Sequence, residues 1–532
     1  MLEKIKSFGV EKIIILLICL SFFIGTWHAL PMLNVVGDEM YYVGGVLRAI
    51  ENHTVIPFPD DVPYGTLTYL VSFVVSTFSI AGLLTFFSFD VAALKVFLIQ
   101  SPSIMYFLLR LTSACLSVVM LVFVNKILKR EFQDFKIRVF LLVLLFTNII
   151  VTTILHTGKM WVLSTLLVLI SFFYLYKSTE NNVLTEVDTD LNKNIFKSII
   201  FSFLALSNFP LNLYSLICVP ILLFWFKGDK KIIKKILVYT FVGAVIYGLV
   251  TLFNFEGIKN QIISIFVVYH PIVGDISSNL NFLASLRVYL IKLVILFPVV
   301  ITLLFVSIKD GVRNKNLFII SFIYFLVYFG LIVVVANWTS DVRSYLRYLF
   351  PLGFFLVFIA ASFNLKFKRI FYIFAFISVY FGVHTIYLLS VPTTYNKAYD
   401  WVNTNLSFQN VIIVNEISYL QLVKNKQSSL YTKESFCSTK CKNIISSDLN
   451  SDFKPLVIDP ISKEFDFSRR KEDVYYIKET PVEDNSLKLV ASFVNTGDVY
   501  HSVDYNLGSY FDLDYLRLKN LGKNHYIYKK SL

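Results

Sequence analysis

The chain has 532 residues, of which 56% are hydrophobic, 17% aromatic and only 16% charged. A soluble protein of this size cannot bury so much apolar surface, which excludes a soluble globular protein and predicts an integral membrane protein. The net charge is +13, but the basic residues gather in short segments between apolar runs. That pattern is typical of cytoplasmic anchors, so we expect membrane lipids and no nucleic acid as partners.

The first apolar run covers residues 13–30 and follows Lys4, Lys6 and Lys12. Its end lacks a convincing cleavage site of small residues, which favours an uncleaved first span over a secretory signal. We therefore expect the N-terminus to be cytoplasmic.

Further apolar runs of spanning length bring the total to about eleven crossings, at about 1.5 Å of rise per residue. A stretch at 67–100 is interrupted by Gly82, Asp90 and Lys95, and we expect interfacial or re-entrant helices there, with a hairpin of two short spans as the alternative. The spanning runs after the first are residues 103–125, 139–155, 161–176, 195–209, 213–226, 236–253, 288–308, 317–336, 348–363 and 370–389.

One threading of these runs places every basic cluster on the cytoplasmic side of a cell membrane. The transmembrane domain is then 1–390, with an outer loop at 31–66, and the tail 391–532 is extracytoplasmic. The clusters are Lys126/Lys129/Arg130/Lys136/Arg138, Lys227/Lys230/Lys231/Lys234/Lys235, Lys309/Arg313/Lys315 and Lys366/Lys368/Arg369.

The tail has the polar composition and the length of one small domain. We predict a small α/β domain with a helix at 395–406. Cys437 and Cys441 could form a local disulfide outside the cytoplasm, or ligate a metal if other ligands converge on them. The expected strands are 410–415, 455–459, 474–478, 487–491 and 525–529.

Asp38 and Glu39 place two adjacent carboxylates at a membrane surface, a few residues after the first apolar run. Building a helical bundle does not need them there, whereas an enzyme that takes a proton from an acceptor beside a lipid does. The competing interpretation is that Asp38 only caps an amphipathic helix at 39–52. Asp61 follows that helix in the same outer loop and provides a second acidic residue. Two acidic sites that flank one helix favour a cleft between them.

Cations are few in the outer loops. Arg343 and Arg347 are four residues apart at the start of a late span, so they share a helix face that could hold a phosphate or anchor to headgroups. Arg110 lies inside its span, where it could snorkel, form a buried ion pair or bind a ligand.

The sequence segments around these residues resemble those of the GT-C superfamily of polyprenyl-phosphate-sugar-dependent glycosyltransferases. The nearest branches are the protein O-mannosyltransferases and the lipid A aminoarabinose transferases. The resemblance covers about residues 10–390. It is carried by the Asp-Glu after the first span, an acidic-x-Pro segment before the interfacial stretch, and Arg-Tyr-x-x-Pro at 347–351. Asp38 matches the family's essential acidic residue, with Glu39 beside it, and Asp61 matches a second acidic position.

The resemblance also assigns basic residues. Arg110 matches an arginine near the outer start of the second span, and Arg347 with Tyr348 matches the late Arg-Tyr. Val62 stands where some members have a phosphate-binding lysine, which counts against the aminoarabinose branch. Lys159 is the candidate substitute for that charge, with core packing or lipid contact as alternatives.

Such enzymes, by resemblance, move a sugar with inversion from a lipid phosphate to an acceptor hydroxyl on the outer face, and the acceptor could be a protein, a lipid or a glycan. Asp38 would accept the proton while arginines stabilise the phosphate, so we expect no cofactor and no metal, although related oligosaccharyltransferases use a divalent ion. Two rival interpretations are a transporter or flippase and a non-catalytic module whose tail binds a partner.

Overall fold

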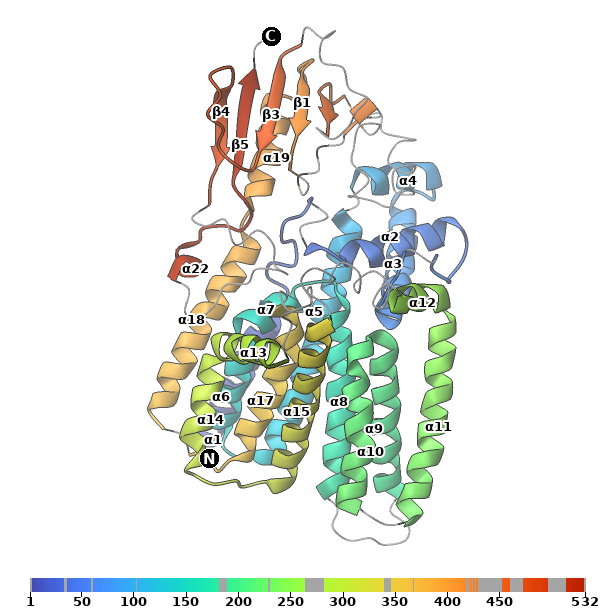
Figure 1. Cartoon of the computed structure of the whole chain (residues 1–532), viewed down its shortest axis with the longest axis vertical. Coiled ribbons are helices and arrows are strands. Elements are labelled where there is room, and N and C mark those ends of the chain that lie inside the picture. Colours follow the sequence, from blue (N-terminus) through green and yellow to red (C-terminus); the bar gives the residue numbers. More distant parts are fainter. Residues whose placement is uncertain are drawn as a thin grey trace.

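The computed structural model is mainly helical and carries a small sheet near the C-terminus (Figure 1). It describes residues 2–32, 36–58, 61–101, 103–180, 189–227, 230–263, 282–338, 346–366, 368–417, 420, 422, 424–425, 427–428, 452–459, 472–495 and 513–530. Arg343, Cys437 and Cys441 lie outside these residues.

The helices before residue 264 are α1 (Leu2–Ser21), α2 (Glu39–Glu51), α3 (Thr66–Phe86), α4 (Val91–Gln100), α5 (Ser103–Glu131), α6 (Phe135–Phe146), α7 (Ile149–Leu155), α8 (Met160–Glu180), α9 (Thr189–Asn208), η2 (Pro210–Asn212), α10 (Leu213–Lys227), α11 (Lys230–Leu252) and α12 (Phe255–Ile263). Those after it are α13 (Phe282–Leu296), α14 (Pro298–Ile308), α15 (Lys315–Trp338), η5 (Leu346–Leu349), α17 (Phe350–Ser362), α18 (Ile370–Ser390), α19 (Thr394–Asn405) and α22 (Leu513–Arg517).

The described part of the chain has 6 helices long and apolar enough to cross a membrane, or up to 8 if each of two bent pairs is one span. These helices make the chain a membrane protein. The predicted runs 139–155 and 288–308 are the bent pairs, α6 with α7 at 70° and α13 with α14 at 91°. The helix α3 has the length of a span, so the interfacial position of 67–100 and the total of about eleven crossings stay predictions.

The apolar run 13–30 is helical only as far as Ser21, and turns follow it. Tertiary contacts explain the break. Gly25 has a φ of +93°, and a Cβ there would lie 2.8 Å from the Cβ of Leu389. The indole of Trp27 donates to the carbonyl of Ser390 at 3.1 Å, so this segment packs on the end of α18 instead of extending α1.

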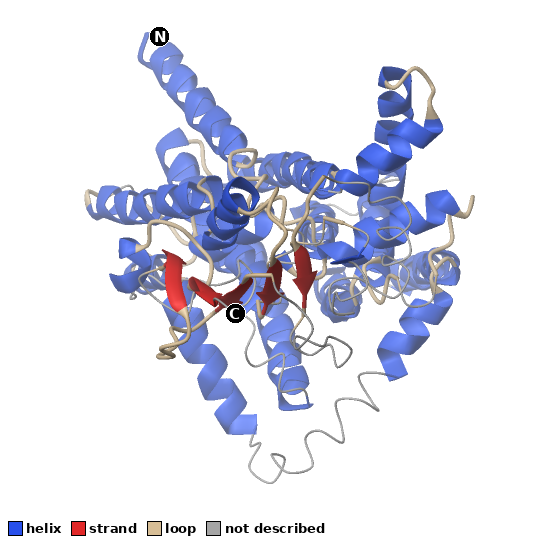
Figure 2. Cartoon of the chain, turned by 90° about the horizontal axis from the view of Figure 1, so that it is seen from above, coloured by secondary structure: helices blue, strands red, loops and turns tan. Residues whose placement is uncertain are grey.

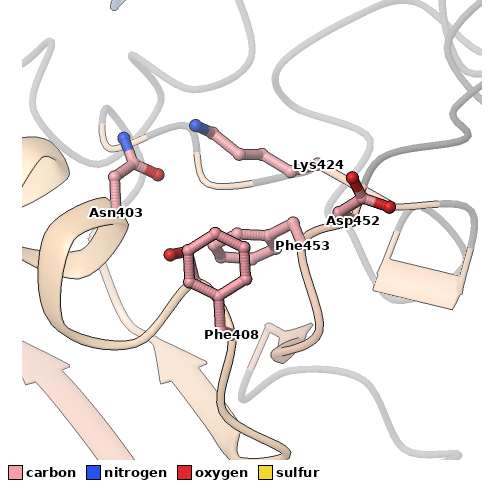
Figure 3. Close-up of a pocket in the computed structure, with 6 residues that line it drawn as sticks. Asn403, Phe408, Lys424, Asp452 and Phe453 are labelled. Carbon is pink, nitrogen blue, oxygen red and sulfur yellow. The ribbon is translucent and has the colours of Figure 1, made fainter.

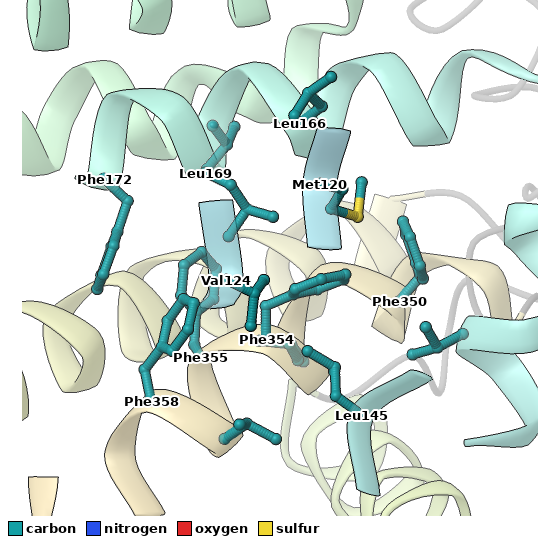
Figure 4. Close-up of a cluster of buried hydrophobic side chains, with 14 of the residues drawn as sticks. Met120, Val124, Leu145, Leu166, Leu169, Phe172, Phe350, Phe354, Phe355 and Phe358 are labelled. Carbon is teal, nitrogen blue, oxygen red and sulfur yellow. The ribbon is translucent and has the colours of Figure 1, made fainter. Parts of the chain in front are cut away.

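Aromatic side chains fill the interior of the bundle between α5, α8 and α17 (Figure 4). The rings of Phe172 and Phe358 stack with centroids 5.0 Å apart, and Phe172 also meets Tyr324 of α15 edge-on at 5.3 Å. Offset and edge-to-face pairs of this kind add to the burial of apolar area. This aromatic core therefore fixes the helices α5, α8 and α17 against one another.

Three of the four basic clusters meet at one end of the bundle. Arg313 pairs with Glu131 at 2.9 Å, Lys368 with Asp310 at 2.8 Å, and Arg138 with the N-terminal helix α1. Figure 1 places the N-terminus at this end and the sheet at the opposite end, beyond α2, α4 and α12. The arrangement agrees with the predicted threading. Which end of the bundle faces the cytoplasm stays a prediction.

The tail contains a five-stranded sheet in the order β2-β1-β3-β5-β4, packed on α19. The strands β2, β1 and β3 are parallel, while β5 is antiparallel to both β3 and β4. Seen from above, the strands lie over the helical bundle (Figure 2). The predicted helix and all the expected strands are confirmed, as β1 (Ile412–Asn415), β2 (Leu456–Ile458), β3 (Val474–Lys478), β4 (Lys488–Phe493) and β5 (His525–Lys530).

The tail is tied to the segment that follows α1. The side chain of Asn396 donates to the carbonyl of Leu30 at 2.8 Å, and Ala29 and Met32 belong to the apolar core of the tail. The sheet domain is therefore seated directly above the stretch that leads into Asp38.

Candidate active site

Asp38, Lys159 and Arg347 come together at the end of the bundle that faces the sheet. Lys159 Nζ lies 3.3 Å, and Arg347 Nη1 3.2 Å, from the same atom, Asp38 Oδ2. The side chains are 16% exposed for Asp38, 1% for Lys159 and 10% for Arg347. One carboxylate thus faces two cations at the edge of the protein interior.

Asp38 stands at the N-cap position of the amphipathic helix α2, as predicted, but its side chain makes no capping hydrogen bond. The carboxylate turns instead to the two cations, one from the loop between α7 and α8 and the other from η5. A cap satisfies backbone N–H groups, and this side chain satisfies none of them. The geometry therefore favours a site residue over a helix cap.

Tyr64 also lies beside this carboxylate, and its phenol helps to lower the pKa of Asp38. Its ring packs edge-on against Tyr41 of α2, with centroids 6.0 Å apart. Neither tyrosine was a predicted site residue, because outer-loop aromatics at an interface are common and carry no specific signal.

The electrostatics of the cluster follow from burial and charge. Burial would raise the pKa of Asp38, but the charges of Lys159 and Arg347 and the nearby phenol of Tyr64 together hold this pKa below its ordinary value. Burial lowers the pKa of Lys159 to about 8, against the opposing charge of Asp38. Lys159 is therefore the member of the cluster closest to losing its charge near neutral pH.

Glu39 points away from this cluster into a buried ion pair with Arg110. Arg110 Nη2 lies 2.7 Å from Glu39 Oε2, and both side chains are 0% exposed. Arg110 Nη1 also donates to the carbonyls of Thr26 and His28, at 3.2 and 2.5 Å. All three of its partners are groups of the protein itself, so the placement favours the buried-ion-pair interpretation of Arg110 over donor binding.

Gly158 links the two parts of the site. Its N–H donates to Glu39 Oε1 at 2.6 Å, and a Cβ at this position would lie 2.5 Å from the side chain of Leu109. Only glycine fits so close an approach. Because Glu39 follows Asp38 and Gly158 precedes Lys159, the bond fixes the backbones that carry the facing charges.

Asp61 connects the outer loop to α2 through an ion pair with Arg48. Arg48 Nη1 donates to both of its oxygens at 3.1 and 3.2 Å, and the guanidinium lies 3.5 Å from the ring centroid of Phe58. Val62, the next residue in the chain, is fully buried. Asp61 thus helps to shape the loop that supplies Tyr64.

Tyr348 is half-buried beside Arg347, and its ring meets Trp161 edge-on at 5.2 Å. Its carbonyl accepts a hydrogen bond from Tyr328 at 2.9 Å. These contacts fix the turn η5 and with it the backbone of Arg347.

Within the described residues, no group of three or more His, Cys, Asp or Glu side chains could hold a metal ion. A hollow of about 390 Å³ lies in the tail, where Asn403, Lys424 and Asp452 surround the rings of Phe408 and Phe453 (Figure 3). Lys424 Nζ lies 4.4 Å from the ring centroid of Tyr399, and none of the residues that line the hollow belongs to the Asp38 cluster.

No protein-family model matches the sequence, and no curated protein matches it. Among solved structures, the fold is similar to an archaeal oligosaccharyltransferase AglB from Archaeoglobus fulgidus, solved in complex with an inhibitory peptide and a dolichol-phosphate. The TM-score is 0.39 and the sequence identity 12%, and the likeness covers 77% of this chain and 59% of the AglB chain. A likeness at this level does not define a family.

Proposed function

We propose that this chain is a membrane glycosyltransferase that moves a sugar from a polyprenyl-phosphate donor to an acceptor hydroxyl. The observation that carries the proposal is the convergence of Lys159 and Arg347 on Asp38 beside the sheet-bearing end of the bundle. A base next to two cations suits a reaction that takes a proton and releases an anion.

In the proposed reaction, the acceptor oxygen attacks the anomeric carbon of the sugar. The bond between that carbon and the phosphate oxygen breaks, and the phosphate keeps the bonding electrons. Asp38 takes the proton of the acceptor hydroxyl, while Lys159 and Arg347 stabilise the negative charge on the leaving phosphate. Attack from the face opposite the phosphate inverts the anomeric carbon.

Donor binding would also activate the base. Before binding, both cations depress the pKa of Asp38 against the effect of burial. An arriving phosphate competes for these cations and weakens their hold on the carboxylate. The pKa of Asp38 then rises toward the range in which a carboxylate accepts a proton more readily.

The test is sugar transfer by the purified full chain in lipid nanodiscs, supplied with radiolabelled polyprenyl-monophosphate sugars. We expect cleavage of the donor to sugar-free polyprenyl phosphate, with the label on an acceptor or in released sugar. In sealed vesicles, movement of the intact donor across the bilayer without cleavage would instead establish a transporter.

Affinity for the donor should fall as the pH rises through about 8, the pKa of Lys159. Lysine is charged below its pKa and neutral above it, so each pH unit above this value removes about nine-tenths of the remaining charged form. Binding of a polyprenyl phosphate across a pH series measures the effect. Lys159→Arg should extend binding to higher pH, since arginine stays protonated. Equal pH profiles for the two proteins would exclude Lys159 as the titrating group.

We also propose that the N-terminus is cytoplasmic and the tail extracytoplasmic, because the basic clusters lie at the end of the bundle away from the sheet. In a background without the natural cysteines, Ser486→Cys should react with an impermeant thiol reagent in intact cells, and Lys309→Cys should react only after lysis. Both positions are exposed in the folded chain, so accessibility reports the side of the membrane. The reverse labelling pattern would invert the topology.

A further inference from the structure

Tyr42 is a buried phenol whose role the proposed reaction does not explain. Its side chain is 0% exposed, and its hydroxyl has no hydrogen-bond partner within the described part of the chain. The backbone of Met160 contacts the phenol oxygen and lowers the pKa of Tyr42, as a group that donates to this oxygen does, so the O–H itself is left without an acceptor among the described residues. A buried donor left without an acceptor is costly and calls for an explanation such as a ligand.

The hydroxyl of Tyr42 lies beside the Asp38 cluster. Tyr42 is one helical turn after Asp38 on α2, and the charges of Asp38 and Arg347 both act on its hydroxyl. Met160, which approaches the phenol oxygen, directly follows Lys159 in the chain. The unsatisfied donor therefore lies near Asp38 and Arg347, and beside the backbone that carries Lys159.

Gly65 keeps the surroundings of this hydroxyl clear. It adopts a φ of +77°, and a Cβ there would lie 2.4 Å from the oxygen of Tyr42. Its chain neighbour Tyr64 lies beside Asp38, so the same turn places one tyrosine near the carboxylate and leaves space at the other. Burial raises the pKa of Tyr42 well above its ordinary value, so the phenol keeps its proton at neutral pH and can donate it in a hydrogen bond.

We infer that Tyr42 is a substrate-binding residue whose hydroxyl donates a hydrogen bond to a phosphate oxygen of the lipid donor, completing a cradle with Lys159 and Arg347. The inference rests on the proposed function and adds a neutral donor to its two cations. A phosphate oxygen suits this position because it is a strong acceptor that can meet a phenol and two cations at once.

The test is binding of farnesyl phosphate, a lipid phosphate without a sugar, to the purified full chain in nanodiscs. Tyr42→Phe should weaken binding by about ten- to a hundredfold, the usual effect of removing a hydrogen bond to a charged group. Binding of farnesol, which lacks the phosphate, should be equal in the variant and the wild type. The unfolding temperature should not fall, because the lost hydroxyl had no partner.

Tyr214 provides a matched control. It is also fully buried, and its hydroxyl has no partner among the described residues, but it lies in α10, where its ring centroid is 4.5 Å from that of Tyr328. Tyr214→Phe should bind farnesyl phosphate like the wild type.

The variants separate the two proposals. If Arg347→Ala weakens farnesyl phosphate binding and Tyr42→Phe does not, the cradle stands without Tyr42 and only this inference is overturned. An equal loss of farnesyl phosphate and farnesol in Tyr42→Phe also overturns it, because the phenol would then act through packing. If the wild type does not bind farnesyl phosphate, both proposals are overturned.

Discussion

A purified chain carrying Asp38→Asn should transfer sugar roughly 10² to 10⁴ times more slowly than the wild type, the range expected on removing a general base. Asparagine keeps the size of the side chain but cannot accept the proton. Helix capping does not confound the result, because the Asp38 side chain makes no capping hydrogen bond. The measurement is the initial rate at saturating donor, on protein shown to be folded by size-exclusion chromatography and thermal unfolding.

Asp90→Asn is the matched control for this substitution. Asp90 is exposed at the N-cap of α4 and accepts a hydrogen bond from the N–H of Ala93 at 3.0 Å. Asparagine caps helices about as well as aspartate, so this variant should keep both its rate and its stability. Equal rates for Asp38→Asn and Asp90→Asn would remove Asp38 from the role of base.

Elements with a local signal could be predicted from the sequence. The amphipathic helix α2 follows from apolar residues at helical spacing, and β3 from a run of branched and aromatic residues bounded by polar ones. Both patterns arise within a few residues and need no partner elsewhere in the chain. The same holds for α19, whose capping box is formed by Thr393 and Asn396.

Breaks in apolar runs were harder to predict, because hydropathy does not distinguish a straight helix from a bent one. The run 139–155 contains neither proline nor glycine, yet it divides at Thr147 and Asn148, where Asn148 caps α7. Its amide also donates to the carbonyl of Leu296, a residue 148 positions away. The break therefore depends on a tertiary contact that no sequence window contains.

The same contrast between local patterns and long-range contacts applies to the site. The sequence indicates that Asp38, Lys159 and Arg347 are unusual charges for a membrane-protein surface, but not that they meet across 121 and 309 positions. The sequence left three interpretations of Arg110 open, namely snorkelling, a buried ion pair and ligand binding. It could not decide between them because the pair with Glu39 spans 71 positions. Tyr42 and Gly158 had no signal, since an aromatic residue on an amphipathic helix and a glycine in a loop are ordinary.

The Glu39–Arg110 pair should have the largest effect on stability. Arg110→Met should lower the free energy of unfolding by about 3 to 5 kcal/mol, because it leaves the carboxylate of Glu39 buried without a compensating charge. The same change frees the carbonyls of Thr26 and His28 from their donor. Denaturant unfolding of the purified chain in detergent measures the loss.

A second variant separates charge from packing. Adding Glu39→Gln to Arg110→Met removes the uncompensated charge and keeps an oxygen that can accept the N–H of Gly158, so the double variant should be more stable than the single one. Lys259→Met is the control, since the Lys259–Glu256 pair is 50% exposed on both sides and should contribute at most about 1 kcal/mol. If Arg110→Met loses no more stability than Lys259→Met, the buried pair does not stabilise the fold. If instead the double variant recovers stability but not sugar transfer, the pair positions Asp38 and Lys159 for the reaction in addition to holding the helices together.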